Sequence, residues 1–227
     1  MRCGRSWLRA TAAALCAMAA AAALAAHGPA GPAAAGEPPA GRLAEASADA
    51  RQVARWVEAS GDNGGRPYAI VDKKSARLFV FAPDGRELGA TPALLGEAVG
   101  DDTVPGVGDK PPSQVLPGER TTPAGRFVSE PGRNLSGEHV VWVEYDSGFA
   151  IHRVRPGASQ AGRLQRLASP TPEDNRNSLG CVVVDVPFYE SVVLPVLGQE
   201  RAIVYVLPET RAVSSVFDVR RLALQQR

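Results

Sequence analysis

Cysteine is scarce in this sequence. Only three of the 227 residues are cysteines, and two of these, Cys3 and Cys16, lie among the first 26 residues. A chain that loses this segment keeps Cys181 alone, which excludes an internal disulfide and a cysteine-based zinc site. The three histidines, at positions 27, 139 and 152, cannot make a His-Glu-x-x-His site because no two are four residues apart. We therefore expect no metal and no other cofactor. The lone thiol remains open between an inert buried residue, half of an intermolecular disulfide and a reactive nucleophile.

The sequence also lacks an excess of charge of either sign. Its 25 basic and 24 acidic residues give a net charge of +1. No strong electrostatic field is therefore available to attract nucleic acid, and we expect no nucleic-acid partner. Apolar residues make up 44% of the chain, which is too many for wholesale disorder. The 42 glycines and prolines indicate a fold with many loops.

The first 26 residues have the pattern of an export signal. Arg2, Arg5 and Arg9 precede an alanine-rich apolar run over residues 10–26 that ends in small residues. This order predicts a secretory signal peptide that is cleaved, and the alternative is a retained anchor. The run is shorter than the roughly 20 strongly apolar residues of a stable span, so we expect none after cleavage. The sequence thus predicts export to the periplasm or cell envelope.

The remaining chain divides into four parts by composition and period. Residues 27–41 are rich in Pro, Gly and Ala and predict a flexible linker. Residues 42–61 predict an amphipathic helix that packs loosely, residues 66–209 a folded domain, and residues 210–227 a tail. Strands are predicted at 68–71, 77–81, 126–128, 139–145, 149–152, 181–186 and 203–207, a helix at 187–197, and long polar loops at 96–122 and 153–179. The fold class is therefore mainly β with few short helices.

The surroundings of Cys181 favour chemistry. Ser178, Leu179 and Gly180 precede it at the end of a polar loop, and an apolar strand follows. Gly180 permits close approach of a substrate, and backbone N–H groups of this loop are placed to face an oxyanion. A thiolate needs a nearby base, and His152 ends another predicted strand. The alternative for His152 is a hydrogen-bonded structural histidine.

Three stretches together carry a family resemblance. The first runs from Ala76 to Phe81 with a turn at Asp84-Gly85, the second is Thr122-Pro-Ala-Gly-Arg-Phe127, and the third combines Ile151-His152 with Ser178-Leu-Gly-Cys-Val182. In this order they resemble the catalytic domain of peptidoglycan L,D-transpeptidases of the YkuD type, over about residues 67–208.

The resemblance implies a β-sandwich with Cys181 as nucleophile and His152 as general base. It places Ser178, Leu179 and Gly180 in the motif that shapes the oxyanion pocket. The implied reaction is acyl transfer between peptidoglycan stem peptides: the thiolate forms an acyl-enzyme, and an amine of a second stem resolves it to form a cross-link. The implied partners are those stem peptides, and no metal is required.

The sequence departs from the family pattern at three positions. The family often has His where this chain has Leu179, Gly where it has Arg153, and Arg or Asn where it has Val183. The segment between His152 and Cys181 is also about ten residues longer than is usual in the family. Val183 cannot donate a hydrogen bond, so a polar contact of the family is absent at this position.

The basic loop between the two candidate catalytic residues offers substrate contacts. Arg153, Arg163, Arg166 and Arg176 are candidates for binding stem-peptide carboxylates. The alternative is a solvated loop without such a role. Two other functions stay open as well: a hydrolase (L,D-carboxypeptidase or amidase) on the same scaffold, and a non-catalytic wall-binding module. The sequence leaves the oligomeric state open.

Overall fold

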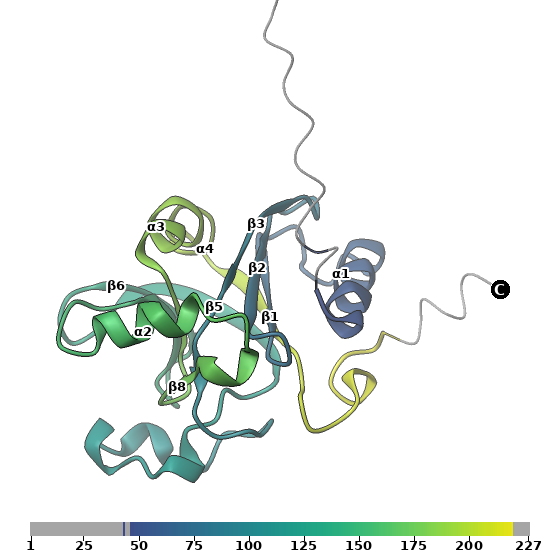
Figure 1. Cartoon of the computed structure of the whole chain (residues 1–227). Coiled ribbons are helices and arrows are strands. Elements are labelled where there is room, and N and C mark those ends of the chain that lie inside the picture. The colour runs from purple at the N-terminus through teal and green to yellow at the C-terminus, as the bar shows by residue number, and fades with distance from the viewer. Residues whose placement is uncertain (1–42, 44–45, 220–227) are drawn as a thin grey trace, which may run out of the picture. The chain divides into compact units, whose positions relative to one another are not determined.

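The computed structural model describes residue 43 and residues 46–219. The predicted signal peptide at 1–26 and the predicted linker at 27–41 lie outside the described residues, as does the end of the tail. Within the described part the fold is mainly β, as the sequence predicts, with ten strands and few short helices (Figure 1). None of its helices has the length and apolar character to cross a membrane.

The elements have the following bounds. The strands are β1 (Tyr68–Asp72), β2 (Arg77–Phe81), β3 (Glu87–Pro92), β4 (Leu95–Gly96), β5 (Gly125–Arg133), β6 (His139–Glu144), β7 (Phe149–Arg153), β8 (Arg176–Ser178), β9 (Val182–Val184) and β10 (Ala202–Val206). The helices are α1 (Ala48–Ser60), α2 (Gln160–Leu167), and a continuous run of α3 (Val186–Phe188), a π-helical turn (Tyr189–Val193) and α4 (Leu194–Leu197).

Eight strands form one sheet in the order β3-β2-β1-β10-β5-β6-β7-β9. The long strand β5 pairs with β10 through its first half and with β6 through its second half, so it joins two halves of the sheet. At the far ends, the backbones of Leu94 and Val183 exchange two hydrogen bonds of 2.7 and 2.9 Å. This bridge brings the β3 end of the sheet back to β9, so the sheet nearly closes on itself.

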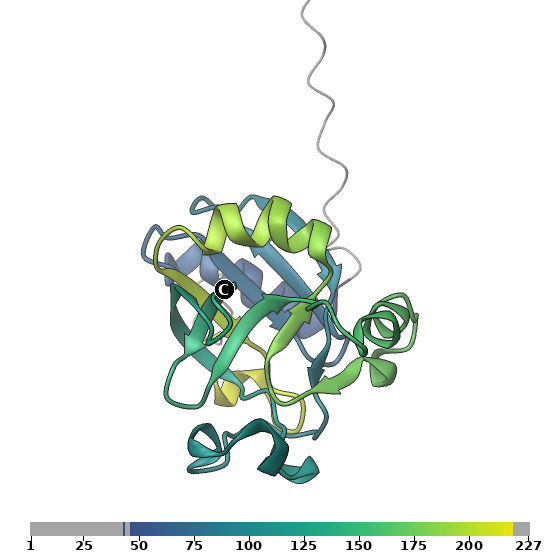
Figure 2. The same ribbon diagram turned by 90° about the vertical axis from the view of Figure 1, so that its left-hand side faces the viewer.

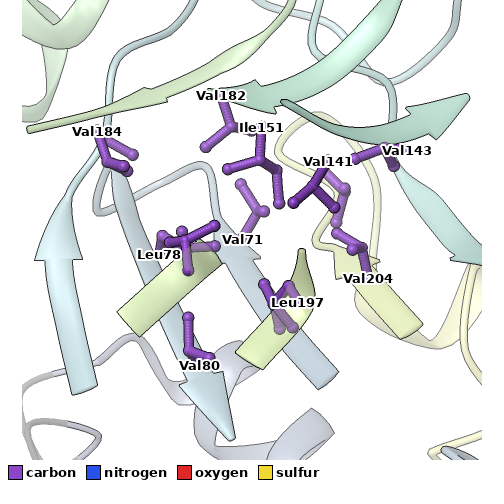
Figure 3. Close-up of a cluster of buried hydrophobic side chains, with 14 of the residues drawn as sticks. Val71, Leu78, Val80, Val141, Val143, Ile151, Val182, Val184, Leu197 and Val204 are labelled. Carbon is purple, nitrogen blue, oxygen red and sulfur yellow. The ribbon is translucent and has the colours of Figure 1, made fainter. Parts of the chain in front are cut away.

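The main core lies inside this curved sheet. Val71, Leu78 and Val204 from one half face Val141 and Ile151 from the other (Figure 3). The helical run from α3 to α4 covers the open side of this core, with Tyr189, Val193 and Leu197 buried against it (Figure 2). Since side chains alternate between the faces of a strand, residues 150, 152 and 154 of the β7 segment point away from this core.

Helix α1 packs firmly, which corrects the expectation of loose packing. Ser47 caps its first turn by accepting a hydrogen bond from Ala50 N–H at 3.1 Å, and Gly61 ends it in the left-handed region. Val53 and Trp56 are buried in a second apolar cluster on the outer face of β1, β2 and β10. Residues 213–219 join the same cluster, so the folded unit extends beyond the predicted boundaries of 66 and 209 at both ends.

The two predicted loops differ in content. Residues 96–122 are irregular, as predicted, with three short 3₁₀ turns at 107–109, 112–114 and 117–119. The segment 153–179 is not only loop, because it contains α2, a 3₁₀ turn at 172–175 and β8. Helix α2 lies beside β7 and β9 (Figure 2), where Leu167 packs on Val154 and Val183. The single apolar anchor Leu167 explains why the sequence period did not reveal this helix.

Candidate active site

The loop before β9 holds Cys181 in a fixed backbone conformation. Ser178 Oγ accepts a hydrogen bond from Gly180 N–H at 3.1 Å and donates one to the Cys181 carbonyl at 2.6 Å. Gly180 has φ +133°, and a Cβ at this position would lie 2.8 Å from the carbonyl oxygen of Thr121. Only glycine fits there without strain. The expectation that Gly180 N–H faces an oxyanion does not fit this structure, because Ser178 already accepts that hydrogen.

Thr122 ties the second resembling stretch to the cysteine loop. Its side chain is fully buried; Oγ1 donates to the Gly180 carbonyl at 2.8 Å and accepts from Gly96 N–H at 2.8 Å. One hydroxyl therefore satisfies two buried backbone groups that belong to different loops. The sequence placed Thr122 in a motif but did not reveal this bracing role.

His152 lies on β7, and Cys181 directly precedes the neighbouring parallel strand β9, on the same face by the register. His152 of β7 pairs with Val183 of β9, so the register continued back by two residues sets Cys181 opposite Ala150. The spacings of strands and residues put the Cα atoms of His152 and Cys181 about 8 Å apart. This distance is short enough for the two side chains to approach each other. The structure thus places the two residues that the sequence singles out on adjacent strand segments, while the hydrogen bonds of their side chains go to backbone carbonyls.

The imidazole of His152 is held in one orientation. The side chain is buried, and Nδ1 lies 2.8 Å from the carbonyl oxygen of Arg153. A carbonyl can only accept, so Nδ1 carries the hydrogen and Nε2 keeps a free lone pair. This is the tautomer that a general base needs. The Cys181 thiol, in turn, contacts the Gly148 carbonyl at 3.5 Å.

Burial and two nearby guanidinium groups set the charge state of the pair. Burial lowers the pKa of His152 to about 4, and the charges of Arg155 and Arg163 add to this effect. Burial also raises the pKa of the Cys181 thiol, while Ala150 N–H and the same two arginines oppose the rise. At neutral pH the resting pair is therefore a neutral thiol and a neutral imidazole, not a preformed ion pair.

One side of Cys181 rests on an apolar cluster. Leu94, Val154, Leu167 and Val183 form this cluster, and the half-buried Cys181 packs against it. Val183, the position where the family has a polar residue, is almost fully buried here and serves packing. Leu179, two residues before Cys181, by contrast leaves 42% of its surface exposed.

Three of the four arginines predicted to bind substrate carboxylates are engaged elsewhere. Arg153 forms an ion pair with Glu138 at 2.7 Å and lines a cavity of about 230 Å³ with Tyr189. Strand alternation puts it on the opposite face of β7 from His152. Arg166 donates to the backbone carbonyl of Asp174 at 2.8 Å. The structure does not bring these two residues to the thiol.

Arg176 belongs to a buried ionic cluster that the sequence did not reveal. It pairs with Glu209, whose carboxylate also lies 3.4 Å from the ammonium of Lys73. Lys73 is fully buried and donates to Asp101 at 2.8 Å and to the Thr122 carbonyl at 2.9 Å. Burial opposes ionisation of Asp101, but hydrogen bonds, that from Lys73 first, hold its pKa below the usual range. The cluster holds the backbone of Thr122 in place through the hydrogen bond from Lys73 to its carbonyl.

Sequence reasoning also missed Arg155 and the backbone groups around the thiol. Arg155 comes three residues after His152, and no pattern marks its charge as acting on the pair. Register would have pointed to Ala150, but only once β7 and β9 were known to be parallel partners. Among the described residues no group of three or more His, Cys, Asp or Glu side chains is arranged to hold a metal ion.

Comparison with known proteins adds no assignment. No model of a known protein family matches the chain, and no curated protein matches it.

Proposed function

We propose that this protein is a cysteine-dependent acyltransferase of the L,D-transpeptidase type that cross-links peptidoglycan stem peptides. The observation that carries the proposal is the placement of Cys181 and His152 on one face of the β7–β9 pair, with Nε2 of His152 free to accept a proton. The resemblance of three sequence stretches supplies the substrate class. Two of these stretches meet at the Thr122–Gly180 hydrogen bond.

The neutral resting pair defines the order of the proton transfers. His152 Nε2 takes the Cys181 proton as sulfur attacks the donor carbonyl, so thiolate and imidazolium form during the reaction. The imidazolium then gives this proton to the leaving amine, and a thioester remains on Cys181. The amine of a second stem attacks the thioester, His152 takes its proton, and the thiol is restored.

The same intermediate has a second possible fate. If water resolves the thioester, the products are a shortened stem and free enzyme, which makes the protein a carboxypeptidase. A protein of this kind acts where stem peptides are, so we place it in the cell envelope, in agreement with the predicted export signal.

Muropeptide analysis by mass spectrometry tests the proposal. Protein added to stem peptides is expected to form cross-linked dimers, and Cys181→Ala is expected to abolish them, with a loss of several orders of magnitude in rate. His152→Gln should be nearly as severe. The matched control is His139→Gln, because His139 is exposed on β6 and contacts Arg133 rather than the thiol. Cross-linking that survives Cys181→Ala would refute the proposal.

Two features of Cys181 favour a non-catalytic wall-binding module instead. The raised pKa of the Cys181 thiol and its contact with the Gly148 carbonyl are features of an unreactive cysteine. This alternative predicts binding to peptidoglycan that is unaffected by Cys181→Ala, and no mass adduct after incubation with a carbapenem. An adduct that disappears in Cys181→Ala would exclude it.

A further inference from the structure

Arg163 lies on the side of α2 that faces the cysteine. Leu167 of this helix packs in the apolar cluster that Cys181 contacts. Arg163 comes four residues earlier, which puts it on the same face of the helix, one turn nearer its N-terminus. Its charge acts on both Cys181 and His152, as expected for a guanidinium beside the pair.

One donor of the Arg163 guanidinium has no partner within the described part of the chain. Its Nε atom is buried from solvent and makes no hydrogen bond. Its neighbours differ: Arg166, on the same helix, is bound to Asp174, and Arg155 lies 3.4 Å from a Glu138 carboxylate oxygen. A buried donor without an acceptor is costly, and the cost is greater for a charged group. An anion bound beside the thiol would remove this cost.

The geometry points to Arg163 as the residue that binds a carboxylate of the acyl donor beside Cys181. It thereby selects donors in which a free carboxylate follows the bond that is cleaved. This inference rests on the proposed function for the identity of the donor. A planar guanidinium suits the task because it can meet a carboxylate through two parallel hydrogen bonds. The other arginines of this region are Arg155, Arg166 and Arg176. Among these four described residues, Arg163 is the one with a buried donor that lacks an acceptor.

Two alkylating reagents test the site without any enzymatic activity. Iodoacetate carries a carboxylate, whereas iodoacetamide is its neutral analogue of nearly the same shape. The ratio of their rates with Cys181 cancels the thiolate fraction, since both reagents attack the same sulfur. We expect Arg163→Gln to lower the iodoacetate-to-iodoacetamide ratio roughly tenfold, the value of one lost charge-assisted contact. Arg166→Gln, on the same helix, should leave the ratio within about twofold.

A second variant guards against a folding defect. Arg163→Lys keeps the positive charge and the aliphatic stem but loses the two-pronged geometry, so its ratio should fall between those of wild type and Arg163→Gln. Far-UV circular dichroism of each variant checks the fold. An unchanged ratio in folded Arg163→Gln or Arg163→Lys would overturn the inference.

A donor pair then links the site to substrate choice. A tetrapeptide donor with a free terminal carboxylate is compared with its terminal amide, and kcat/KM is measured for both. Wild type should prefer the free acid by about tenfold or more, and Arg163→Gln should lose this preference. If the wild type transfers no acyl group yet Arg163→Gln lowers the alkylation ratio, the anion site stands and the proposed function fails. If transfer occurs and neither ratio changes, the proposed function stands and the role of Arg163 is refuted.

Discussion

Replacement of Thr122 by valine should separate the hydroxyl from the shape of this side chain. The two side chains have nearly the same volume, but valine can neither accept from Gly96 N–H nor donate to the Gly180 carbonyl. Both backbone groups would stay buried without a partner, at about 1–3 kcal/mol each. We therefore expect Thr122→Val to lower the free energy of unfolding by roughly 2–6 kcal/mol.

Thr122→Ser is the matched control. It keeps both hydrogen bonds and removes one buried methyl group, which costs about 1 kcal/mol. The measurement is urea unfolding followed by tryptophan fluorescence and circular dichroism, with the slope checked for each variant. Because Thr122 braces Gly180, the valine variant should also alter the alkylation rate of Cys181, whereas the serine variant should not. Equal stabilities of the two variants would refute the bracing role.

Three further predictions concern stability. As pH falls from about 6.5 to 4, His152 takes up a proton in the unfolded state but not in the folded state, so the free energy of unfolding should decrease by about 3 kcal/mol. His152→Gln should remove this part of the pH dependence in urea unfolding. If the free energies of unfolding of wild type and variant changed with pH in parallel, the prediction would be contradicted. Lys73→Met leaves the Asp101 carboxylate buried without its cation and should cost about 3–5 kcal/mol by urea unfolding, unlike Lys74→Met, whose partner is near the surface. Trp56→Ala should cost about 3–5 kcal/mol in the same assay, since Trp56 fills the cluster beneath α1, and a loss under 1 kcal/mol would favour loose packing.

Local patterns were enough to predict most strands and the two candidate catalytic residues. The apolar, β-branched and aromatic runs at 78–81 and after Cys181 predict strands because they report burial directly. The helix at 187–197 was predicted from Pro187 at its start, and the structure has a continuous helical run there.

What the sequence could not provide is long-range pairing. The parallel contact of β7 with β9 joins residues about 30 positions apart, and a helix intervenes. No local pattern encodes such a partner, so neither the shared face of His152 and Cys181 nor the proximity of Arg163 could be derived. The buried Lys73 was missed for the same reason, because its acceptors Asp101 and Glu209 come from distant loops.

The position of β10 has a consequence for how the chain matures. This strand is nearly the last in sequence, yet it lies between β1 and β5 in the middle of the sheet. The two halves of the sheet cannot join until residues 202–206 have arrived, so a chain still emerging from a ribosome or a translocation pore lacks its centre. The sheet that positions Cys181 and His152 would thus be completed only after nearly the whole polypeptide has been delivered.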